Sequence, residues 1–158
     1  MFLHLLIVLL IAAAVHAVRL KERTRERVGE VALLWLLIGY CGVPMVAMSV
    51  ASLLQPDRMA EMLGLPAGSP FQAFVSVALL GLAVAALLAG IYRGTALVAA
   101  TAAWAVYWTG ATWIHVQDYG GLGAIDAHAF LHAFVSHGLV AILLVAALVA
   151  SGRLRGTR

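Results

Sequence analysis

The chain has 158 residues, which is room for one domain. Hydrophobic residues make up 64% of it and charged residues 11%, whereas a soluble domain carries about 25% charged residues and is less than about half apolar. A soluble fold of this length could not bury so much apolar surface, so the composition predicts an integral membrane protein. The formal charge of +3 does not indicate nucleic-acid binding, because nearly all Lys and Arg flank apolar segments instead of gathering on one face.

Five apolar stretches contain no charged residue. A transmembrane helix needs about 20 residues to cross about 30 Å of hydrocarbon, and the last four stretches reach that length. The first stretch, with 17 residues, is at the lower limit. The sequence therefore predicts an all-α integral membrane helical bundle that forms a single transmembrane domain over residues 1–158. Its five transmembrane helices are expected at residues 2–18, 31–54, 71–92, 95–116 and 127–152.

The first apolar stretch is followed by basic residues and not preceded by them. A signal peptide has the opposite order, although residues 15–17 loosely fit a small-residue cleavage site. Basic segments stay on the cytoplasmic side of a membrane, so this stretch is expected to insert with the N-terminus outside and to remain as a span. The basic residues that follow it are Arg19, Lys21, Arg23, Arg25 and Arg27.

The distribution of charge predicts the orientation of the whole chain. With segment 19–27 inside, Arg93 and the C-terminal arginines also lie inside, and only Arg58 remains outside. Such an excess of basic residues is typical of cytoplasmic connections. We therefore predict a multi-pass protein of a bacterial cytoplasmic (inner) membrane, with a cytoplasmic C-terminus and contacts to membrane lipids.

Several helix boundaries have recognisable capping residues. Ser69 and Gln72 form a capping box around Pro70, and Asp126 is placed to cap the last span. A short interfacial helix is expected to begin near Pro56, in the loop between the second and third spans.

Within the spans, proline and small residues predict local geometry. Pro44 has no N–H and its ring clashes with an earlier carbonyl, so a kink is expected in the second span. Gly81 and Ala85 in the third span, and Gly110 in the fourth, allow the backbones of membrane helices to approach closely.

Four of the six histidines lie in the final third of the chain, on the side predicted to face outward. The simplest interpretation is that they are neutral, hydrogen-bonded residues at helix contacts or at the membrane interface. A second is a b-type haem or quinone-linked redox protein, with His115 and His132 as axial haem ligands from neighbouring spans. A third is an outer-side copper or zinc site formed by His128, His132, Met59 and Met62, because imidazole and thioether groups suit Cu(I).

The motifs of common enzymes are missing from the sequence. No Asp, Glu, Lys or Arg lies within a span, and there is no acyl-transfer elbow, zinc-protease motif or phosphate-binding loop. The single cysteine, Cys41, excludes an internal disulfide. On a regular helix His137 lies 180° from His128, so one helix cannot aim both at one site. No catalytic residue and no cofactor other than the alternative haem b is predicted, and the chain is not expected to be an enzyme.

Two motifs resemble those of a known family. The segment 63–72, LGLPAGSPFQ, is similar to the signature of a family of small, uncharacterised bacterial and archaeal polytopic membrane proteins, a domain of unknown function. The segment 110–115, GATWIH, resembles a Gly-Ala-x-x-x-His element in a later helix of that family. The family pattern has an acidic residue shortly after Phe-Gln, where this chain has Ala73 and Phe74. The resemblance implies the multi-helix fold and transfers no activity, because none is established for the family.

The small-residue faces favour a function in helix association. We expect a non-enzymatic accessory subunit of a larger membrane complex, or a homo-oligomer, because a bundle this short leaves helix faces that can pack against other proteins. The redox protein and the metal-handling protein described above are the alternatives.

Overall fold

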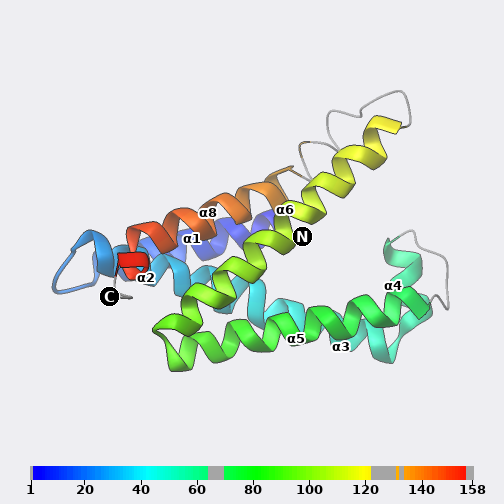
Figure 1. Ribbon diagram of the computed structural model, residues 1–158, viewed down its shortest axis with the longest axis horizontal. Coiled ribbons are helices and arrows are strands. Elements are labelled where there is room, and N and C mark those ends of the chain that lie inside the picture. The colour runs from blue at the N-terminus through cyan, green and yellow to red at the C-terminus, as the bar shows by residue number, and fades with distance from the viewer. Residues whose placement is uncertain (1, 64–69, 122–130, 132–133, 156–158) are drawn as a thin grey trace.

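The computed structural model describes residues 2–63, 70–121, 131 and 134–155, and within these ranges the chain is helical with short connections and no strand. The helices form an elongated bundle (Figure 1). The all-α prediction is therefore confirmed for the described residues. The elements are α1 (Phe2–Val18), α2 (Arg25–Leu34), η1 (Trp35–Gly42), α3 (Val43–Leu54), α4 (Pro56–Leu63), α5 (Pro70–Tyr92), α6 (Thr95–Gly121), η2 (Phe134–Gly138), α8 (Leu139–Ala150) and η3 (Arg153–Arg155).

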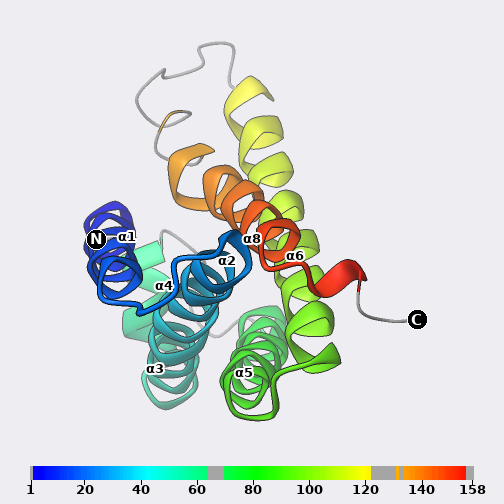
Figure 2. The ribbon, with the colours of Figure 1, turned by 90° about the vertical axis from the view of Figure 1, so that its left-hand side faces the viewer.

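Elements α2, η1 and α3 form one continuous helix, Arg25–Leu54, against which most of the other helices pack. Helix α1 packs on α2 and η1, α8 packs on α2, and α5 packs on η1 and α3. Seen from one end, α2 lies between α1 on one side and α8 and α6 on the other (Figure 2). Helix α6 contacts both α5 and α8, which closes the bundle.

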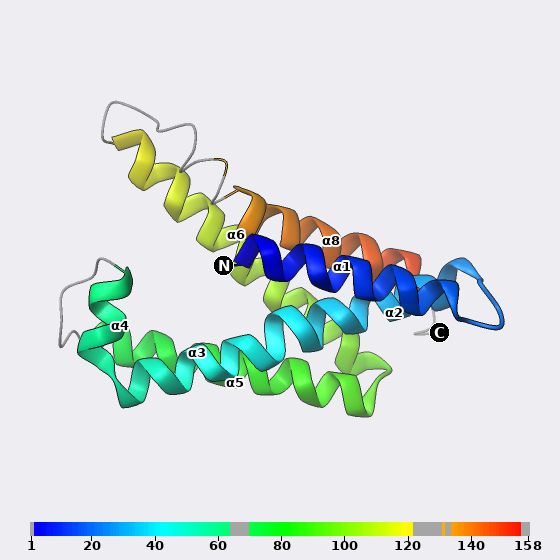
Figure 3. The ribbon, with the colours of Figure 1, turned by 180° about the vertical axis from the view of Figure 1, so that it is seen from behind.

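The long central helix changes direction before Pro44. Segment η1 is π-helical, and beyond it the N–H of Val43 donates to the carbonyl oxygen of Ile38, five residues earlier. Pro44 has no N–H to give to the carbonyl of Tyr40, and the wider turn ahead of it accommodates the missing bond. The change of direction between α2 and α3 is visible in Figure 3. The sequence predicts this kink but not the π-helical turns that produce it.

Three connections meet at one end of the molecule: the α1–α2 connection, the α5–α6 turn and the C-terminal segment (Figure 1). Arg93 Nη1 donates to Glu30 Oε1 at 2.7 Å, and Arg153 Nη2 lies 2.8 Å from the same oxygen. Partial burial alone would raise the pKa of Glu30, but the hydrogen bonds and charges of the two arginines outweigh it and hold this pKa below its usual range. One ionised carboxylate on α2 therefore joins the α5–α6 turn to the C-terminal segment.

Two helix backbones approach each other closely beside this ion-pair network. A Cβ built on Gly29 would lie 2.5 Å from the backbone N of Ser151 and 2.7 Å from the backbone C of Ala150. Further along the same helix, a Cβ on Gly39 would lie 2.5 Å from a methyl carbon of Leu9 in α1. Glycine at these positions lets α8 and α1 pack directly on the backbone of the central helix.

Two helices are long and apolar enough to cross a membrane, by length and composition: Arg25–Leu54 and Pro70–Tyr92. In Pro70–Tyr92, only 28% of the most apolar 18-residue stretch is buried. Helices α1 and α8 are apolar but shorter, and α6 has the length but carries several Trp, Tyr and Thr residues that lower its mean hydropathy. Length and hydropathy thus identify two of the five expected spans.

The contact between α2 and α8 generates the first prediction. Gly29→Ala should lower the stability of the protein, because the new methyl group meets the α8 backbone, which has no side-chain rotamer to relieve the overlap; such overpacking costs about 1–3 kcal/mol. Thermal unfolding of the purified protein in detergent measures this change.

Gly81→Ala is the matched control, because Gly81 is also inside a helix and a Cβ added to it would have no atom within 4 Å. Both substitutions gain about 1 kcal/mol of intrinsic helix propensity, so the difference between them isolates the contact. Equal unfolding temperatures for the two variants would contradict the close packing of α2 on α8.

Candidate functional site

Aromatic rings gather where α6 crosses η1. Trp104 and Trp108 lie one turn apart on α6, so they share a face, and their rings stack with centroids 5.6 Å apart and planes 27° apart. Tyr107 packs edge-on against both, at 5.4 Å from Trp104 and 5.0 Å from Trp108. Tyr40 of η1 packs edge-on against Trp108 at 5.8 Å. The rings join α6 to the central helix at a buried point of the core.

Both buried indole N–H groups have acceptors in neighbouring helices. Trp104 Nε1 donates to the carbonyl oxygen of Leu82 in α5 at 3.1 Å. Trp108 Nε1 donates to the Sγ of Cys41 at 3.5 Å. The single cysteine is fully buried, and its sulfur serves as the acceptor for an indole that would otherwise be unpaired in an apolar core.

Two histidines extend the stack of rings toward the far end of α6. His137, in the π-helical segment η2, packs on Trp108 with ring centroids 5.0 Å apart. His115 stacks on His137 at 5.1 Å with the planes 26° apart. We call this stack the ring column, and its members in spatial order are Trp104, Trp108, His137 and His115.

The ring column pairs His115 with a different histidine from the one expected. The predicted partner for haem, His132, lies outside the described residues, so the haem prediction stays a prediction. The sequence relates His137 only to His128 on its own helix, and the contact of His137 with a neighbouring helix is not predicted. The signal available in the sequence is spacing: His115 follows Trp108 by seven residues, two turns along the same face of α6.

The predicted metal ligands are not brought together in the part of the chain that the structure describes. Met59 is buried in α4, the side chain of Met62 is not described, and His128 and His132 lie outside the described residues. Within the described ranges, no group of three or more His, Cys, Asp or Glu side chains could hold a metal ion. The copper or zinc site therefore also stays a prediction.

Of the three predicted capping residues, the structure describes only Gln72. Ser69 and Asp126 lie outside the described residues. The amide nitrogen of Gln72 donates to Ser52 Oγ at 3.3 Å and to the carbonyl oxygen of Pro56 at 3.0 Å. Ser76 Oγ lies 2.8 Å from Ser52 Oγ. Gln72 thus takes part in a buried polar contact between α5 and the α3–α4 junction, which the sequence pattern does not predict.

The chain belongs to a family of unknown function, DUF6790, whose model matches residues 1–157. The predicted resemblance to a family of unknown function is therefore confirmed. No curated protein and no solved structure matches the chain. The family membership covers nearly the whole chain and assigns no activity to the ring column.

The ring column yields a second prediction. Trp108→Ala should destabilise the protein by about 3–5 kcal/mol, because it removes a ring that contacts Tyr40, Trp104 and His137 and leaves a cavity in the core. Cys41, now uncovered, should also react faster with a maleimide reagent, and no other cysteine competes.

Trp113→Ala on the same helix is the matched control. Its side chain is 62% exposed, so its removal should leave both the unfolding temperature and the labelling rate of Cys41 close to those of the wild type. If the two tryptophan variants behave alike, the ring column does not support the core.

Proposed function

We propose that the protein is a five-span helical membrane protein that serves as an accessory subunit and docks other transmembrane helices on small-residue faces of α5 and α6. The observation that carries this proposal is that Gly81 and Gly110 lie open: a Cβ built on either glycine has no atom within 4 Å. Gly29 and Gly39, in contrast, are covered by the chain's own helices. Open glycines on membrane helices permit a second helix to approach closely.

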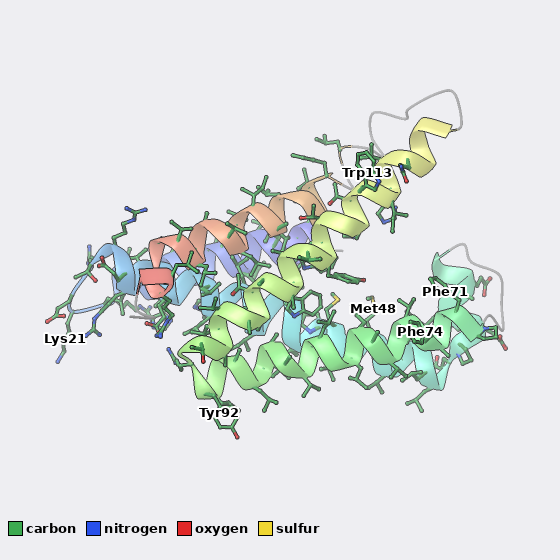
Figure 4. The ribbon with its side chains drawn as sticks, in the orientation of Figure 1. Lys21, Met48, Phe71, Phe74, Tyr92 and Trp113 are labelled. Atoms are coloured by element: carbon green, nitrogen blue, oxygen red, sulfur yellow. The ribbon has the colours of Figure 1, made fainter. Side chains whose placement is uncertain are left out.

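The exposed apolar side chains of α5 indicate that the bundle lies in apolar surroundings. Phe71 and Phe74 lie near one end of α5 and Tyr92 at the other, and all three are more than 70% exposed (Figure 4). Between them Val77, Val84 and Leu88 are also exposed. A soluble monomer rarely leaves so continuous an apolar face in water, whereas lipid or another helix covers it at no cost.

The meeting of the basic segments at one end supports the proposed orientation. Segment 19–27, Arg93 and Arg153 come from distant parts of the sequence, and Glu30 joins the last two. Helix α4, which carries Asp57, lies at the opposite end of the long axis (Figure 1). If the basic end is cytoplasmic, every connection between spans obeys the positive-inside rule, with the N-terminus outside and the C-terminus inside.

The orientation predicts a labelling pattern for single added cysteines. Asp57→Cys should react with a membrane-impermeant maleimide in intact bacterial spheroplasts, and Lys21→Cys should react only after the membrane is permeabilised. Both side chains are exposed, and the native Cys41 is buried and should give no background. The reverse pattern would show that the orientation is opposite to the one proposed. Equal labelling at both positions in intact spheroplasts would contradict the proposal that these two positions lie on opposite sides of the membrane.

The docking faces predict a measurable assembly. Protein that is produced in its own organism and extracted in a mild detergent should give a native mass above the 16.7 kDa of one chain. Gly81→Leu together with Gly110→Leu should shift the mass toward 16.7 kDa, because the added side chains keep a second helix at a distance.

Ala14→Leu on α1 is the control for added bulk on an exposed helix face, and it should leave the assembly unchanged. The unfolding temperature of the double glycine variant should not fall below that of the wild-type chain, because no residue of its own chain is displaced and leucine has a higher helix propensity than glycine. A wild-type protein that is monomeric in every mild detergent and in lipid nanodiscs would overturn the accessory-subunit proposal.

A further inference from the structure

A groove runs along the central helix between α1 and the basic end of the molecule. Its apolar part, with a volume of about 280 Å³, is lined by His16, Val31, Leu34, Trp35, Ile38 and Gly39. Its polar part, of about 240 Å³, is lined by three of the same residues together with Leu20, Arg27, Glu30 and Arg93. His16, Val31 and Leu34 border both parts, so the two cavities adjoin. Joined, they fall within the range of roughly 300–1,000 Å³ that is typical of ligand sites.

The junction between the two parts is held by a hydrogen-bonded pair from two helices. Trp35 Nε1 donates to His16 Nδ1 at 3.3 Å, and the two rings meet edge to face. Helix α1 lies alongside α2 here (Figure 3), and the imidazole of His16 satisfies the indole N–H of Trp35. On the Gly39 side of this pair the wall of the groove is apolar, and on the Arg27 side it carries charged groups.

The polar part carries an excess of positive charge. This part is lined by the guanidinium groups of Arg27 and Arg93 and by one carboxylate, that of Glu30, which is paired with Arg93 and also with Arg153 outside the groove. Arg27 is 62% exposed and its only ion pair among the described residues is a 3.6 Å contact with the exposed Glu22, a kind of surface pair that is easily exchanged. Arg27 and Arg93 thus offer guanidinium N–H groups to an anion, and guanidinium forks match the oxygens of a phosphate.

The length of the groove matches one leaflet of a membrane. Gly39 follows Arg27 by 12 residues, which is no more than about 18 Å at the α-helical rise of about 1.5 Å per residue. Half of the hydrocarbon core of a bilayer is about 15 Å thick, with the phosphate groups immediately outside it. A molecule with a phosphate at the basic end and an acyl chain toward Gly39 fits both the charge and the length of the groove.

We propose that this groove binds one anionic glycerophospholipid, with its phosphate between Arg27 and Arg93 and one acyl chain along Trp35, Ile38 and Gly39. The inference rests on the membrane location and orientation proposed above. A free phosphate would use only the polar part, and a neutral detergent only the apolar part, so the adjoining parts select an amphiphile with an anionic head. The bound lipid would fill the space between α1 and the central helix and hold α1 in place.

Native mass spectrometry of the full chain in a non-ionic detergent tests this site. After addition of phosphatidylglycerol, one lipid should be retained per chain, and phosphatidylcholine of the same chain lengths should be retained about tenfold less. Arg27→Gln should weaken retention of phosphatidylglycerol by about tenfold, because it removes one of the two phosphate ligands.

Arg25→Gln is the matched control: it removes the same charge from the same exposed turn of α2, but Arg25 does not line the groove. Retention in this control should stay within about twofold of the wild type. Leu34→Trp should block the groove where its two parts meet, and Val106→Trp, at an exposed position of α6, controls for the added ring. If the Leu34→Trp variant unfolds, the role of the apolar part is tested on the wild-type protein with a short-chain phosphatidylglycerol. This lipid should be retained more weakly than the long-chain form.

Three outcomes would contradict the proposed lipid site. Equal losses from Arg27→Gln and Arg25→Gln would mean that the basic end attracts lipid only through its net charge. Full displacement of the lipid by inorganic phosphate would reduce the groove to an anion site, and equal retention of short and long chains would remove the role of the apolar part. These results are independent of the cysteine labelling in spheroplasts. If the protein spans the membrane as proposed but retains no anionic lipid, only the proposed lipid site is refuted.

Discussion

The arrangement of the helices depends on one carboxylate at the basic end. Glu30 accepts from Arg93 and pairs with Arg153, so it connects the start of the central helix with the α5–α6 turn and with η3, which follows α8. One residue earlier, Gly29 brings the backbone of the central helix against that of α8. The charge network is partly exposed and therefore adds little energy by itself. Its effect is positional: it offsets the repulsion between Arg93 and Arg153 next to the point where Gly29 meets α8.

From this end the helices diverge as two groups, one built around α3 and α5 and the other around α6 and α8 (Figure 1). The ring column lies where α6 crosses the central helix, and it links these groups by buried aromatic contacts and by the indole hydrogen bonds of Trp104 and Trp108. In an apolar environment such hydrogen bonds and close contacts hold helices together, because apolar burial gives no preference for protein over lipid. The π-helical turns of the central helix carry Tyr40 and Cys41, and both residues contact Trp108.

Local features of the fold were predictable from the sequence, and contacts between helices were not. Helix α1 ends at Val18, where the charged segment begins, α4 begins at Pro56, and the kink lies at Pro44, because proline and charge act on the backbone of their own segment. The pairing of His115 with His137 depends instead on how α6 crosses the last helix and on the π-helical register of η2, which shifts side chains away from the 100° step of a regular helix. The link from Glu30 to Arg93 and Arg153 joins distant parts of the chain, and charge patterning shows only that these residues share an end.

The proposed lipid groove and the proposed docking faces use different parts of the surface. The groove follows the side of the central helix that carries α1, whereas α6, with the open Gly110, lies on the other side of α2 (Figure 2). A lipid in the groove would therefore leave the α6 face free for a second helix. It would also occupy the space beside Arg93, which lies in the α5–α6 turn and pairs with Glu30. One molecule could therefore hold a lipid in the groove and a second helix on its docking faces at the same time.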